Sequence, residues 1–145
     1  MSLLELRHVS KAYNEKVLAL DDVNLKVEKG EWLAVMGPSG SGKSTLMNII
    51  GCMDSATSGE VILDGEVLTD ATPEELTRYR RDKIGIVFQQ FHMIPYLTAV
   101  ENIMVAQYYH SMPDRNEAMA ALERVGLADR ASHLPSQLSG GEQQR

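Results

Sequence analysis

A glycine-rich segment carries the clearest chemistry in the chain. Residues 37–44 read Gly-Pro-Ser-Gly-Ser-Gly-Lys-Ser, a full match to the phosphate-loop pattern G-x-x-x-x-G-K-[ST]. Its glycines allow backbone N–H groups to approach a dense negative charge, Lys43 would reach the β- and γ-phosphates, and the Ser44 hydroxyl would ligate Mg²⁺. We therefore predict a nucleoside-triphosphate site and keep a plain glycine-rich turn as the alternative. The residues of the predicted site are Gly37, Pro38, Ser39, Gly40, Ser41, Gly42, Lys43 and Ser44.

A second motif stands at residues 138–145, Leu-Ser-Gly-Gly-Glu-Gln-Gln-Arg. Ser139 and Glu142 have the spacing of a capping box, and Gly140 and Gly141 leave the first amides of a helix uncovered. A bare helix N-terminus attracts anions, so the segment predicts a second anion-binding device, with an ordinary helix cap as the alternative. The helix that it opens has no apolar face in these residues to dock it.

With both motifs in place, the chain resembles the ATPase of ABC transporters, in the group of lipoprotein-releasing and macrolide-export systems. The resemblance runs from Leu4 to Arg145. Two positions depart from the usual pattern, since Ser55-Ala56 stands where a proline is common and His92-Met93 where Asn-Leu is usual. The other stretches that carry the resemblance are residues 45–54, 57–61, 80–85, 87–91 and 97–102.

The resemblance implies roles for particular residues. Tyr13 would stack on adenine, and Thr45 would extend the nucleotide contacts of the phosphate loop. Gln89 would meet Mg²⁺ through its amide oxygen and would act with Lys43 in catalysis. Ser139, Gly140 and Gly141 would cap the γ-phosphate held by a second subunit in a head-to-tail homodimer. The cofactors implied are ATP and Mg²⁺. Judged alone, Tyr13 would be an ordinary aromatic and Gln89 a solvated polar residue.

Hydrophobic patterning predicts the elements that position these residues. Alternating apolar residues predict strands near residues 4–6 and 23–27, and continuous apolar runs predict buried strands at 32–36 and 84–88. A helix is expected over 43–51 and a hairpin over 61–68. Capping signals predict three more helices, beginning after Thr72, Thr98 and Asp114.

The fold implied by the resemblance is an α/β P-loop NTPase domain of the ABC type. We expect one partial domain over residues 1–145, with a β-rich phosphate-loop lobe to about residue 90 and a helical subdomain over about 91–145 that ends in the signature motif. It would comprise an N-terminal β subdomain, a partial RecA-like core and the helical subdomain. The family carries an apolar strand ending in Asp-Glu after the signature, so we expect a C-terminally incomplete domain that lacks Walker B and the catalytic Glu and shows no ATPase activity alone.

Composition narrows the choice of partners. The chain has 145 residues with 14 Lys and Arg against 20 Asp and Glu, a net charge of −6, which argues against nucleic acid as a partner. It shows no secretory signal and no long apolar run, so membrane contact would come through an integral membrane permease subunit or domain. The apolar segment 91–97 would be its contact, unless these side chains fill a seam between lobes. A zinc site is not expected, because Cys52 is the single cysteine.

The leading hypothesis is the ATP-binding subunit of an ABC transporter for export or lipoprotein release, peripheral on the cytoplasmic face of the inner membrane. Two alternatives remain open. One is a soluble ABC ATPase that acts outside transport, and the other is an inactive interaction module that binds nucleotide.

Overall fold

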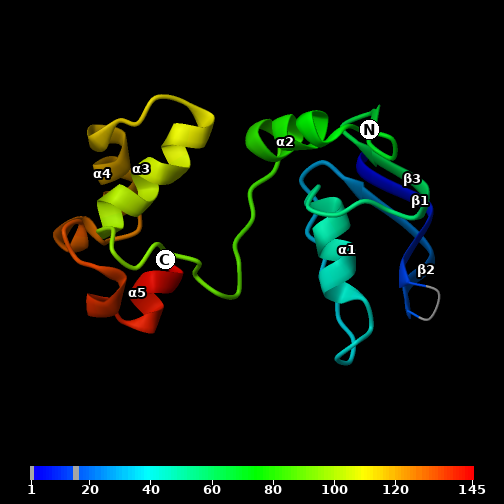
Figure 1. The fold of residues 1–145 in the computed structure, drawn as a ribbon, viewed down its shortest axis with the longest axis horizontal. Helices are drawn as coiled ribbons and strands as arrows, with labels where there is room; N and C mark the ends of the chain where they lie inside the picture. Colours follow the sequence, from blue (N-terminus) through cyan, green and yellow to red (C-terminus); the bar gives the residue numbers. More distant parts are fainter. Residues whose placement is uncertain (1, 15–16) are drawn as a thin grey trace. The chain divides into compact units, whose positions relative to one another are not determined.

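The computed structural model describes residues 2–14 and 17–145. The chain divides into two compact units, Met1–Gly85 and Ile86–Arg145 (Figure 1). Each unit has its own buried apolar cluster. The two units are therefore described separately.

The first unit is built on an antiparallel sheet with strand order β2-β1-β3-β4. The strands are β1 (Ser2–Asn14), β2 (Val17–Glu28), β3 (Ser58–Leu63) and β4 (Glu66–Val67). The alternation predicted near the N-terminus is confirmed, because Leu4 and Leu6 are buried and Val23, Leu25 and Val27 pack against the same cluster. The predicted hairpin is also present: Asp64 and Gly65, with φ of 50° and 84°, turn β3 into β4 as a primed turn requires.

Two helices complete this unit, and α1 lies alongside the sheet (Figure 1). Helix α1 (Lys43–Ile50) buries Leu46 and Ile49 in the cluster formed by the sheet. Helix α2 (Pro73–Asp82) begins with the predicted capping box of Thr72 and Glu75. The buried members of the cluster are Leu4, Leu6, Val9, Leu20, Leu46, Ile49, Cys52, Val61, Leu63, Leu68 and Tyr79.

The second unit is helical. Helices α3 (Ala99–His110) and α4 (Arg115–Arg124) pack on each other, and both begin at the predicted caps, Thr98 and Asp114. Two short 3₁₀ turns, η1 (Ala128–Arg130) and η2 (Pro135–Gln137), lead to α5 (Gly140–Gln144). The buried residues of this unit are Ala99, Val100, Ala118, Leu122, Leu127 and Leu138.

The predicted buried strands at 32–36 and 84–88 are wrong for this structure. Both segments are irregular loops, and Trp32 and Val87 are 99% and 84% exposed. Continuously apolar strands are typical of parallel sheets, in which partner strands flank them and other elements cover both faces. Within residues 2–14 and 17–145, the strands form the single antiparallel sheet of β1–β4, which offers these segments no parallel neighbour. The predicted RecA-like core is thus represented by the phosphate loop and α1.

Candidate functional site

The phosphate loop lines an open groove of about 670 Å³ in the first unit. Three parts of the chain meet there: the end of β1, the start of β2, and the loop with the first turn of α1. The groove places Tyr13 beside the phosphate loop, although 26 positions separate Tyr13 from Ser39 in the sequence. The residues that line the groove are Tyr13, Val17, Leu18, Ala19, Ser39, Gly40, Gly42, Lys43, Ser44 and Thr45.

Gly42 joins the loop to α1 in a left-handed conformation, with φ 84° and ψ 1°. A Cβ at this position would lie 2.4 Å from the carbonyl oxygen of Ala19, so the space itself requires glycine. As the N-cap residue, Gly42 has no side chain, so in the described part of the chain the first amides of α1 have no side-chain cap. The unpaired N–H groups of a helix N-terminus carry partial positive charge, which suits an anion in the groove.

The Lys43 ammonium folds back over its own loop. Its Nζ donates to the carbonyl oxygens of Gly37 at 2.8 Å and Pro38 at 2.6 Å, and to Ser41 Oγ at 3.3 Å. These three acceptors keep the cation within the loop that lines the groove. A phosphate oxygen would compete for the same donors, and because it carries negative charge it would be a stronger acceptor than these neutral oxygens.

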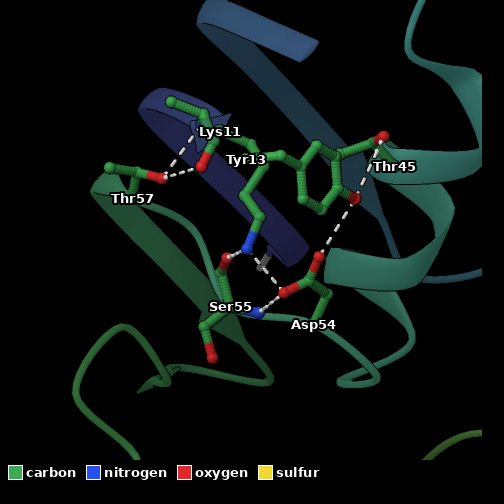
Figure 2. Close-up of polar contacts among 7 residues, drawn as sticks. Lys11, Tyr13, Thr45, Asp54, Ser55 and Thr57 are labelled. Atoms are coloured by element: carbon green, nitrogen blue, oxygen red, sulfur yellow. Dashed lines mark hydrogen bonds and ion pairs between the residues drawn. The ribbon is translucent and has the colours of Figure 1, made fainter. Parts of the chain in front are cut away.

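Tyr13 is held in place by a polar cluster that joins β1, α1 and the segment after α1 (Figure 2). Its Oη lies 3.1 Å from Asp54 Oδ2 and 3.4 Å from Thr45 Oγ1. Lys11 Nζ donates to Asp54 Oδ1 at 2.6 Å and lies 5.1 Å from the centre of the Tyr13 ring. The hydrogen bond from Lys11 holds the pKa of Asp54 below its ordinary value, so this carboxylate is charged at neutral pH.

The predicted signature forms the N-terminus of α5 in the second unit. The Ser139 hydroxyl accepts from the Glu142 N–H at 3.3 Å, and the Glu142 carboxylate accepts from the Ser139 N–H at 2.8 Å, so the predicted capping box is confirmed. Arg130 Nε also donates to Glu142, at 3.1 Å. Hydrogen bonds to the carboxylate, first from the Ser139 side chain and then from the Ser139 N–H and Arg130, lower the pKa of Glu142 to about 2.

Polar contacts dock α5, which the sequence left without an apolar face. The Gln143 amide donates to the carbonyl oxygens of Pro135 at 2.9 Å and Leu138 at 3.0 Å. The Arg145 guanidinium reaches the carbonyl oxygen of Val125 at 3.2 Å. The helix is therefore fixed by side chains that bond to backbone oxygens of the preceding segments.

Gln89 lies in an exposed loop of the second unit, and the signature residues Ser139, Gly140 and Gly141 lie in the same unit, at the N-terminus of α5. The structure thus brings Tyr13 and the phosphate loop together in one unit and places the remaining predicted site residues in the other.

The apolar segment 91–97 ends in a turn organised by Asn102 of α3. The Asn102 side chain accepts from the Ile94 N–H at 2.8 Å and donates to the carbonyl oxygens of Leu97 and Thr98, both at 3.0 Å. Tyr96, at the tip of this turn, is 78% exposed. Asn102 was part of the sequence resemblance, but its role in shaping this turn was not predicted.

Sequence reasoning also missed Lys11 and Asp54, which contact Tyr13, and Thr57, which bonds to the neighbouring Ala12. One signal was available, because residues two apart in a strand share a face, and this rule places Lys11 beside Tyr13. Asp54 and Thr57 come from the loop between α1 and β3, and no local pattern in the sequence links them to β1.

The structure also bears on metal binding and membrane contact. In the described part of the chain, no three or more His, Cys, Asp or Glu side chains gather as a metal-binding group. Of the helices in that same part, none has the length and apolar character needed to cross a bilayer.

Comparisons with known proteins agree on one family. Residues 20–145 match the family described as ABC transporter. The chain is 47% identical to the uncharacterized ABC transporter ATP-binding protein MJ0796 of Methanocaldococcus jannaschii, with 99% of the chain and 65% of that protein covered. It is 46% identical to the macrolide export ATP-binding/permease protein MacB of Burkholderia pseudomallei, with 99% of the chain and 23% of that protein covered.

A solved structure gives the same result. It is the dimeric post-hydrolysis state of the ATP-binding cassette MJ0796 bound to ADP and Pi, and the TM-score is 0.86 at 45% identity. The match covers 97% of this chain and 65% of that one. The chain therefore spans a little less than two thirds of MJ0796 and under a quarter of MacB.

Proposed function

The chain belongs to the ABC transporter family, and from this premise we propose that it binds ATP with Mg²⁺ in the groove between Tyr13 and the phosphate loop. The observation that carries the proposal is the groove itself, which gathers an aromatic ring, a lysine and a helix N-terminus around one space. A nucleotide presents a planar base at one end and a polyanion at the other. The lining of the groove offers a partner for each, an aromatic ring for the base and a lysine with a helix N-terminus for the polyanion.

The phosphate end would be held by backbone amides of residues 37–44 and by Lys43. Binding requires Lys43 Nζ to exchange its contacts with Gly37, Pro38 and Ser41 for phosphate oxygens. The acceptors given up are neutral oxygens and those gained carry negative charge, so the ammonium gains an ion pair and the exchange favours the bound state.

Mg²⁺ fits the donor at the start of α1. The Ser44 hydroxyl is a hard oxygen ligand in the groove, next to Lys43, and Mg²⁺ prefers such oxygens together with phosphate. When bound, the ion would neutralise charge on the β- and γ-phosphates. The amide oxygen of Gln89 is the second ligand that we propose.

In the whole protein we propose that ATP binding and hydrolysis drive transport through a membrane permease, in export or lipoprotein release at the cytoplasmic face of the inner membrane. One relative is an ATP-binding/permease protein for macrolide export, which supports a permease partner. A dimeric structure of a second relative supports a homodimer, and we propose that it is head-to-tail, with Ser139, Gly140 and Gly141 capping the partner's nucleotide.

Equilibrium binding of ATP to the chain tests the proposal. Changing Lys43→Ala removes charged donors from the phosphate, and we expect a loss of affinity of about 10- to 100-fold. Lys29→Ala, on the exposed turn after β2, is the matched control and should bind ATP like the parent chain. Equal affinity of parent and Lys43→Ala would refute the proposed site.

We also propose that the 145 residues bind nucleotide without turning it over, because no acidic side chain is among the described residues that line the groove and could activate water. Phosphate release that exceeds background and disappears in Lys43→Ala would show this to be wrong.

A further inference from the structure

We propose that Lys11 and Asp54 are positioning residues that hold the Tyr13 ring ready to stack on a nucleobase. This inference rests on the proposed nucleotide site and goes beyond it, because neither residue lines the groove. The cluster is defined by four residues, Lys11, Tyr13, Thr45 and Asp54, and is shown in Figure 2.

The hydroxyl of Tyr13 has two polar partners. Oη lies within hydrogen-bond distance of Asp54 Oδ2 at 3.1 Å and of Thr45 Oγ1 at 3.4 Å. Thr45 is buried in the first turn of α1, and Asp54 follows the end of the same helix. Two contacts at the tip of the ring oppose rotation of the side chain, which is 53% exposed.

A cation also holds the Tyr13 ring. Lys11 Nζ lies 5.1 Å from the ring centre, and the Lys11 side chain is 13% exposed. Tyr13 lines the groove and Lys11 does not, so the ammonium leaves the groove free for a planar ligand. The cation–π contact adds a further restraint on the ring.

The end of β1, which carries the Tyr13 ring, is also held by polar contacts. The Thr57 hydroxyl lies 3.0 Å from the Ala12 N–H, which donates to it, and 3.3 Å from the Ala12 carbonyl oxygen. Lys11 Nζ also donates to the Ser55 carbonyl oxygen at 2.6 Å. Segment 54–57 therefore holds both the Ala12 backbone and the Lys11 side chain near the end of β1 (Figure 2).

These contacts indicate preorganisation. A ring already fixed in its binding orientation loses little conformational freedom when a base stacks on it, so affinity for the base rises without any new contact. Asp54 is central because it accepts from both Lys11 and Tyr13 and, being charged, makes strong hydrogen bonds with them. The ligand class is any nucleotide with a planar base, because stacking is tolerant of base identity.

The test separates base binding from phosphate binding. Dissociation constants for ATP and for inorganic tripolyphosphate are measured on the full chain at the same Mg²⁺ concentration. The ratio of the tripolyphosphate constant to the ATP constant reports the contribution of nucleoside contacts. Stacking on an aromatic ring predicts a ratio of about 5 to 100 for the parent chain, which should approach one in Tyr13→Ala. We expect Asp54→Asn and Lys11→Met each to lower the ratio about 3- to 10-fold and to leave tripolyphosphate affinity unchanged.

Tyr13→Phe is the conservative variant. It keeps the ring and the Lys11–Asp54 ion pair but removes Oη, and it should lower the ratio by a similar factor, so the inference stays testable if Asp54→Asn does not fold. The matched control is Asp64→Asn, which removes the charge from another lysine–aspartate pair of the same unit, 2.8 Å from Lys83. Its ratio should equal that of the parent chain.

Two results would overturn the inference and leave the nucleotide site intact. One is a ratio that falls in Tyr13→Ala but not in Asp54→Asn, Lys11→Met or Tyr13→Phe. The other is a parallel loss of ATP and tripolyphosphate affinity, which would assign the cluster to the shape of the phosphate loop through Thr45. Failure of the parent chain to bind either ligand would instead refute the proposed function, and the inference with it.

Discussion

At the scale of single residues, Gly42 shows how the phosphate loop is fixed by its surroundings. Its φ of 84° is unfavourable for any residue with a Cβ, and the carbonyl oxygen of Ala19 in β2 occupies the space where that Cβ would go. Two separate costs therefore act against substitution, one from conformation and one from packing. The close approach of β2 also forms one wall of the groove.

A comparison with Gly65 separates the two costs. Gly65 has the same φ of 84° but open space around its ideal Cβ. We expect Gly65→Ala to lower the free energy of unfolding by about 1–2 kcal/mol through conformation alone. Gly42→Ala should cost about 1–3 kcal/mol more, because the backbone of β2 or α1 must shift.

Urea unfolding of both variants measures this difference. If Gly42→Ala and Gly65→Ala have equal stability, the contact between Gly42 and β2 carries no energetic weight. Tripolyphosphate affinity should fall only in Gly42→Ala, because Gly65 lies in the hairpin turn, outside the residues that line the groove.

The sequence predicted the residues of the groove better than the residues behind it. Lys43 and Ser44 are part of a local motif with a fixed spacing, and Tyr13 was found only through resemblance to a family. Asp54 became visible only when the fold brought it to Tyr13, across 41 positions. Pairing across such a distance depends on tertiary contacts that no short pattern encodes.

At the scale of elements, the same distinction separates helices from strands. Helices α2 and α3 begin where Thr72 and Thr98 predicted, because a capping box is satisfied within four residues. The segments 32–36 and 84–88 have the composition of buried strands, yet a strand is completed only by its neighbours. Apolar composition therefore shows that these segments are suited to burial. Whether they are buried depends on partner strands that a local pattern does not reveal.

The cap of α5 predicts a pH dependence. In the folded chain the pKa of Glu142 is about 2, against an ordinary value of 4.5. A depressed pKa means that the carboxylate stabilises the fold fully above pH 4.5 and that this stabilisation is lost as the pH falls toward 2. Glu142→Gln should therefore be less stable than the parent at neutral pH and should approach it in acid.

Urea unfolding midpoints of parent and Glu142→Gln across this pH range provide the measurement. Arg130→Gln is a second variant to measure, because it removes one donor to Glu142 and keeps the capping box. Its stability should fall less than that of the parent between neutral pH and pH 2. A difference between parent and Glu142→Gln that stays constant from neutral pH to pH 2 would contradict the lowered pKa.

At the scale of the whole molecule, the chain consists of two units with separate cores. Among the described residues, the buried cluster of the first unit and that of the second have no member in common. Every residue that lines the groove belongs to the first unit. Stability of the groove should then depend on the first cluster and be insensitive to the second.

Two matched substitutions test this division. Leu6 and Leu122 are 2% and 4% exposed and lie in different clusters, so Leu6→Ala and Leu122→Ala remove the same atoms from the two cores. Each should cost about 2–5 kcal/mol in its own unit. Hydrogen exchange should become faster in β1–β3 for Leu6→Ala and in α3–α4 for Leu122→Ala, and tripolyphosphate affinity should fall only in the first variant. Faster exchange in both units from either substitution would mean that the chain unfolds as one cooperative body, and the stability of the groove would then depend on both clusters.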